Sequence, residues 1–151
     1  MAERDRIVDQ LDRAFEGEAW HGPSVMEVLK GVAWKKAVGK PVRGAHSVWE
    51  IVLHITAWED VVRRRLLGET VTLTDEQDWP PVADPGQAGW SRALESLRAG
   101  HARLRETAAG IADKDLDSSP GGKSSTPYVL LHGIIQHDLY HAGQIAVLKK
   151  G

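Results

Sequence analysis

The stretch HGIIQHDLYHAGQIAVLKK, residues 132–150, has the pattern of a helix that runs through a protein interior. Its apolar residues recur every three or four positions, which is typical of a helix with a buried face. His137 and His141 lie on this face, and their spacing places them about 40° apart around the helix axis. The sequence therefore predicts two imidazoles that point into the core from neighbouring turns.

The same apolar spacing occurs in three other long segments and one short one, and no strand-like alternation competes with it. Ser24 with Glu27 and Ser47 with Glu50 form capping boxes, which are typical of helix starts. The predicted fold is all-α, an antiparallel four-helix bundle with one short additional helix, in a single domain 1–151. Long helices are expected at about 4–17, 47–67, 90–108 and 127–150, the short one at about 24–32, and connections at 69–86 and 113–127.

Composition narrows the class of function. The formal net charge of -2 gives no electrostatic reason to expect a nucleic-acid or membrane partner. No apolar stretch approaches the ~20 residues that span a bilayer, and the charged start MAERDRIVDQ lacks the apolar segment of a signal peptide. We therefore expect a cytoplasmic protein that acts on a small molecule. Because cysteine is absent, a metal site would have to use nitrogen and oxygen ligands.

Two buried imidazoles need polar partners, because an unpaired polar group in a core costs a few kcal/mol. A divalent cation would satisfy both, and hydrogen bonds to carboxylates or carbonyls are the alternative. The zincin pattern is excluded, since Asp138 stands where that pattern requires glutamate. A third ligand must come from another helix, and both His54 and His101 lie on apolar helix faces.

The segments SVWEIVLHITAWE (47–59) and LLHGIIQHDLYHAGQIAVLKK (130–150) together resemble the DinB/YfiT-like family of bacterial four-helix bundles. One histidine in the second long helix and an H-x-x-x-H pair followed by G-Q in the last carry this resemblance, which extends over essentially the whole chain. It implies a divalent metal ion, most often zinc or nickel, held by His54, His137 and His141, with water in the remaining positions. His101 is then the reserve ligand.

The resemblance also implies chemistry, because relatives include transferases and isomerases that use low-molecular-weight thiols. The predicted function is therefore a metal-dependent enzyme, either a thiol-dependent S-transferase or a hydrolase. The alternatives are a non-catalytic metal or small-ligand binding protein of the stress response, and an interaction module whose histidines are only structural. We also expect a homodimer, since relatives often form one and a second apolar stripe marks the last helix: Leu131, Ile135, Leu139, Ala142 and Ala146.

Several other residues have expected places. The loops after Trp20 and at 79–81 are candidates for the rim of a pocket, with His21 near its mouth. His46 is expected at the surface or as a capping residue, and His132 in packing or at an interface. Asp138 points away from the face of His137 and is expected in solvent or at an interface.

Overall fold

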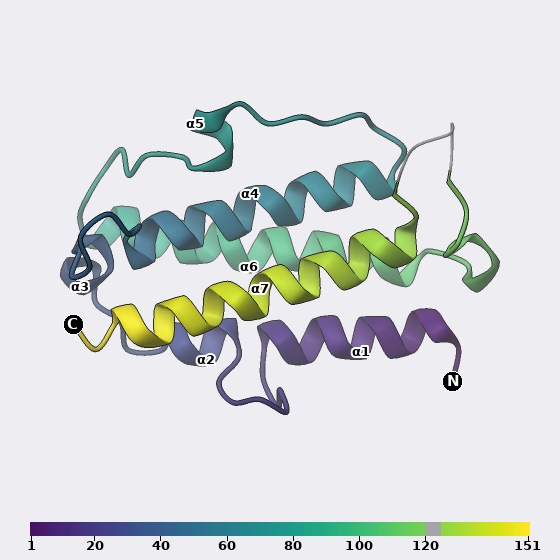
Figure 1. Ribbon diagram of the computed structural model, residues 1–151, viewed down its shortest axis with the longest axis horizontal. Coiled ribbons are helices and arrows are strands. Elements are labelled where there is room, and N and C mark those ends of the chain that lie inside the picture. The colour runs from purple at the N-terminus through teal and green to yellow at the C-terminus, as the bar shows by residue number, and fades with distance from the viewer. Residues whose placement is uncertain (120–124) are drawn as a thin grey trace.

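The computed structural model describes residues 1–119 and 125–151 and is all helical within them, which confirms the predicted all-α bundle (Figure 1). Residues 120–124, part of the second predicted connection, lie outside the described residues. Four long helices form the bundle: α1 (Glu3–Phe15), α4 (Val48–Leu66), α6 (Gln87–Ala109) and α7 (Pro127–Leu148).

The helix starts follow from local chemistry. At α4 the Glu50 amide donates to Ser47 Oγ at 3.1 Å and the Ser47 amide donates to Glu50 Oε2 at 2.7 Å, the predicted capping box. At α7 the Thr126 hydroxyl accepts from the Val129 amide, and Pro127 occupies the first helical position. These caps fix where the two histidine-bearing helices begin.

Within residues 1–119 and 125–151, three short helices accompany the bundle. The predicted one is α2 (Val25–Leu29), with its capping box from Ser24. Two more, α3 (Trp34–Val38) and α5 (Asp75–Asp78), lie in segments for which no helix was predicted, as does the 3-10 turn η1 (Asp113–Asp115). The start of α5 is another capping box, Thr74 with Gln77, inside a segment whose prolines predicted only a connection.

The direction of the helices determines the path of that segment. In Figure 1, α4 and α6 run in the same direction, and α1 and α7 run in the opposite one. The chain therefore has to return along the whole length of α4 before α6 can begin. Residues 67–86 make this crossover and carry α5 over the middle of α4 (Figure 1). The topology thus places a loop segment above the helix that holds His54.

The second apolar stripe of α7 is covered within the chain itself. Leu131 and Ile135 are buried and pack in one cluster with Ile7 and Leu11 of α1. The stripe therefore gives no support for a dimer interface, because a bundle neighbour already covers it. Homodimerisation stays a prediction.

Substituting a residue of this cluster tests the packing. Leu131 has no exposed surface, so Leu131→Ala is expected to lower the free energy of unfolding by about 2–5 kcal/mol. Urea unfolding followed by circular dichroism measures the change. Val147→Ala on the same helix is the matched control, since Val147 is exposed and its loss should leave stability nearly unchanged. Equal stability of the two variants would contradict the packing described here.

None of the helices in the described part of the chain has the length and apolar character needed to cross a membrane.

Candidate metal centre

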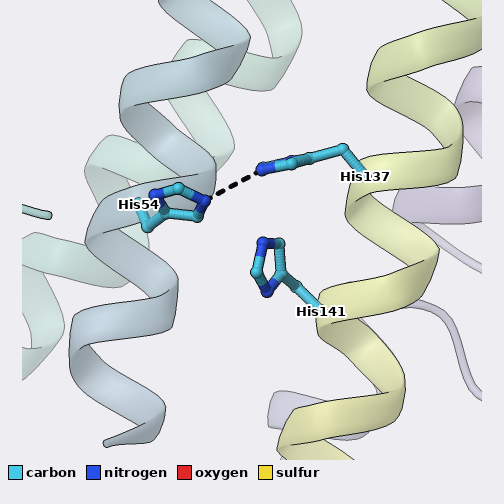
Figure 2. A group of neighbouring side chains, drawn as sticks. All are labelled: His54, His137 and His141. Atoms are coloured by element: carbon cyan, nitrogen blue, oxygen red, sulfur yellow. Dashed lines mark hydrogen bonds between the residues drawn. The ribbon is translucent and has the colours of Figure 1, made fainter. Parts of the chain in front are cut away.

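Three histidines from two helices converge between α4 and α7 (Figure 2). His54 comes from α4, and His137 and His141 lie on successive turns of α7. One ring nitrogen of each lies within 4.8 Å of those of the other two. His54 and His141 are 6% and 5% exposed, whereas His137 is partly open to solvent. The three residues predicted as ligands are therefore brought together in one place.

Each of the three imidazoles turns its Nδ1 toward an oxygen acceptor. His54 Nδ1 lies 2.7 Å from the Asp78 carbonyl oxygen, and His141 Nδ1 lies 2.6 Å from Gln144 Oε1. His137 Nδ1 lies 3.5 Å from Asp138 Oδ1. Since these oxygens can only accept, they favour the tautomer with the proton on Nδ1 in all three rings.

That tautomer leaves the Nε2 lone pairs directed at one another. His54 Nε2 and His137 Nε2 lie 3.0 Å apart, the contact dashed in Figure 2. With both protons on Nδ1, this is a contact between two acceptors, which is unfavourable unless a cation lies between them. Among the described residues the group has three ligand atoms and no fourth. The donor set is therefore a buried histidine site compatible with a divalent metal ion.

Burial also keeps these rings in the state that binds metal. Desolvation lowers the pKa of His54 and outweighs its hydrogen bond to Asp78. Desolvation likewise lowers the pKa of His141 to about 4, in spite of the hydrogen bond to Gln144. Both rings are therefore neutral near pH 7, and only a neutral imidazole has the lone pair that a metal ion requires.

The crossover segment forms a roof over the site. The Trp79 ring stacks on His54 with centroids 3.8 Å apart and on its other face against His46 at 3.5 Å. Asp78 accepts from Trp58 Nε1 at 2.6 Å through its carboxylate, while its carbonyl accepts from His54. The roof is thus tied to α4 by hydrogen bonds as well as by stacking.

Two hollows reach the histidines from different sides. The larger has a volume of about 650 Å³ and is bordered by His141, Gln144 and Trp79. The smaller, of about 270 Å³, is bordered by His137 and Trp58. A metal ion on the three histidines would therefore be reachable by a small molecule, as an open catalytic site requires.

Behind His137 lies a buried polar network that the sequence analysis missed. Asp138 has no exposed surface, so the expectation that it faces solvent or an interface was wrong. It meets Glu59 of α4, also fully buried, and His101 of α6 lies with Nδ1 2.8 Å from Glu59 Oε1. His101 therefore belongs to this cluster and not to the triad.

The network has a defined protonation pattern. Burial raises the pKa of Glu59 well above its ordinary value, and the neighbouring Asp138 charge raises it further. Burial lowers the pKa of His101 to about 4, so that ring is neutral. Burial also raises the pKa of Asp138, but its hydrogen bonds with His137 and Glu59 oppose that shift, so a proton in this pair is favoured on Glu59. A signal for Glu59 was present in the sequence, because it continues the apolar heptad spacing of α4: Val48, Val52, Ile55, Glu59 and Val62.

The remaining histidines lie outside the triad. His21 and the fully exposed Trp20 border a separate hollow between α1 and α7, so the expected rim role of the Trp20 loop was wrong. The segment at 79–81 does contribute to the rim through Trp79. His46 is exposed and stacks on the Trp79 ring, whereas His132 packs on the Tyr128 ring.

Comparison with known proteins agrees with this architecture. A family model described as the DinB superfamily matches residues 7–145 of the chain. Searches of the curated proteins and of the solved structures found no match. The match covers nearly the entire chain, including all four long helices apart from a few terminal residues. The chain belongs to the DinB superfamily.

Proposed function

We propose that the protein is a divalent-metal-dependent enzyme, either an S-transferase that uses a low-molecular-weight thiol or a hydrolase. Its ion, zinc or nickel, is held by Nε2 of His54, His137 and His141. The observation that carries this proposal is the arrangement of the rings, with all three Nδ1 atoms facing acceptors and the opposite nitrogens converging. A divalent ion at such a site supplies Lewis acidity, which lowers the pKa of a ligated water or thiol.

The residues around the site orient the ligand imidazoles and partly exclude water from the cavity. Trp79 lies flat on His54 and shields that ring from solvent. His54 and His141 are each held by one short hydrogen bond, so their ring orientations are fixed before a ligand arrives. The chain has no cysteine, so a reacting thiol has to come from a small molecule.

The larger hollow indicates the kind of substrate. Its walls include Val42, Tyr140 and Val147, three large apolar side chains that are exposed in the free protein. Exposed apolar residues gathered around one cavity favour a ligand with an apolar body. His141 and Gln144 on the same wall place the polar end of such a ligand beside the histidines.

Metal analysis and an activity assay test the proposal together. Tag-free protein is expected to contain about one divalent ion per chain. Conjugation of a thiol to an apolar electrophile, or ester hydrolysis, is expected to stop on treatment with chelator and to resume when the ion is restored. Stoichiometric metal without turnover would favour the metal or small-ligand binding protein. Protein that binds no added zinc or nickel would refute the proposal.

A further inference from the structure

We propose that Asp138, held in place by Glu59, is a positioning residue that orients His137 and strengthens it as a ligand. This inference rests on the proposed metal function and adds to it two buried acids that make no contact with substrate. It concerns the one histidine of the triad whose Nδ1 faces a fully buried carboxylate.

The three histidines differ in how they are held. His141 Nδ1 faces an amide oxygen at 2.6 Å, and His54 Nδ1 faces the Asp78 carbonyl at 2.7 Å and the partly exposed Asp78 carboxylate at 3.2 Å. Within the described residues, His137 Nδ1 faces only a carboxylate, the fully buried one of Asp138, at 3.5 Å. His137 is also the most exposed, with 23% of its side-chain surface open. A neutral acceptor would act weakly at that distance, but the attraction of a charge declines slowly with distance in a buried setting. A carboxylate behind a ligand imidazole also makes the ring more basic toward the metal.

Asp138 cannot turn away from this position. Asp138 and Glu59 have no exposed surface, and they join α7 to α4, the same two helices that carry the triad. His101 of α6 holds Glu59 at 2.8 Å and stacks on Phe15 of α1 with ring centroids 3.7 Å apart. Asp138 is thus linked to α4 through Glu59, to α6 through His101 and to α1 through the stacking of His101 on Phe15.

The hydrogen bonds of this network converge on Asp138 from two sides. His101 donates Nδ1–H to Glu59 Oε1, and His137 directs its Nδ1 toward Asp138 Oδ1. Glu59 Oε2 and Asp138 Oδ2 have no other partner within the described part of the chain. One proton on Glu59, donated to Asp138, satisfies both, so all four carboxyl oxygens are engaged. A shared proton therefore accounts for both carboxyl groups, whereas His101 Nε2 is buried without a hydrogen-bond partner among the described residues.

Cobalt binding to variants tests the role of Asp138. In Asp138→Asn the acceptor oxygen is kept and the charge is lost, so Co²⁺ affinity is expected to fall by about tenfold to a hundredfold. The Co²⁺ affinity of Asp138→Ala is expected to fall by at least the same factor. Asp60→Asn is the matched control, because Asp60 is the partly exposed neighbour of Glu59 on α4 and pairs with Arg63 outside the site. Competition with a coloured chelator measures affinity, and thermal unfolding of the metal-free proteins measures stability separately.

A spectroscopic readout separates positioning from a merely structural role. In the Co²⁺-loaded protein each ligand imidazole should give one exchangeable, paramagnetically shifted N–H signal. Asp138→Ala is expected to broaden or remove one of the three and leave the other two. Unchanged signals and affinity, with only lower stability, would overturn the proposal. Wild type that binds no Co²⁺ would instead refute the metal function itself.

Two variants of Glu59 test how Asp138 is held. Glu59→Gln can still donate to Asp138 and accept from His101, so Co²⁺ affinity is expected to stay close to that of wild type. Glu59→Met has no donor and should weaken binding as Asp138→Asn does. Two ions per wild-type chain and one in Glu59→Gln would overturn the proposal, because the cluster would then be a second metal site.

Discussion

Replacing His54 or His137 by alanine is expected to abolish stoichiometric metal binding while leaving the helical fold intact. The ligands come from α4 and α7, which are far apart in the sequence, so a bound ion cross-links the bundle. At a free metal concentration a hundred times the Kd, wild type should gain about 2.7 kcal/mol of stability, and the variants should gain almost none. Elemental analysis, circular dichroism and thermal unfolding with and without metal provide the measurements.

His21→Ala is the control for this experiment, since His21 is exposed and borders a different hollow. It should retain both the ion and the metal-dependent gain in melting temperature. Full metal occupancy in His54→Ala would contradict the assignment of His54 as a ligand.

Glu59→Gln is expected to stabilise the metal-free protein increasingly as pH rises. Burial and the Asp138 charge raise the pKa of Glu59 well above 4.5, so folding takes up a proton at neutral pH. The stabilisation that Glu59 contributes is fully present at pH values below its pKa in the unfolded chain. It is lost as the pH rises toward the higher pKa that Glu59 has in the folded protein. The cost is about 1.4 kcal/mol for each pH unit above 4.5, until the pKa of folded Glu59 is reached. Glutamine avoids this cost because it does not titrate.

Urea unfolding from about pH 5 to about pH 7 tests this, with the difference between Glu59→Gln and wild type as the measured quantity. His101 has a lowered pKa, so by itself it makes the protein less stable as pH falls from 6.5 toward 4. That trend is common to both proteins and cancels in the difference. A difference that is constant over this range, or of opposite slope, would show that Glu59 is ionised in the folded protein.

The helix boundaries could be predicted because short-range chemistry determines them. Ser47 with Glu50 and Thr126 with Pro127 are each readable within a few residues, and the structure confirms both helix starts. The meeting of His54 with the His137–His141 pair could be predicted from helix faces together with the family resemblance, which selected His54 over His101. Metal ligation itself stays a prediction.

The crossover segment over the site and the buried network of Asp138, Glu59 and His101 depend on how the helices pack. Local sequence patterns do not contain that information. Asp78 and Trp79 reach His54 only because α4 and α6 are parallel and the chain must cross back over the site. Asp138 was expected in solvent or at an interface, although its spacing from Ile135 and Ala142 places it on the second apolar stripe of the helix. Since α7 is covered by α1 as well as by α4, its neighbouring face is core too.

The crossover also sets how far this protein can be remodelled. The 19 residues of α4 span about 28 Å, a distance that about nine extended residues could bridge. Residues 67–86 are roughly twice as many as this minimum. The segment is therefore longer than the connection of α4 to α6 requires, and its extra length covers the histidines. A chain trimmed around α5 could still close the bundle while exposing His54 to larger molecules. In natural relatives and in designed variants, we expect this segment to change in length and composition more freely than the four helices, and substrate range to change with it.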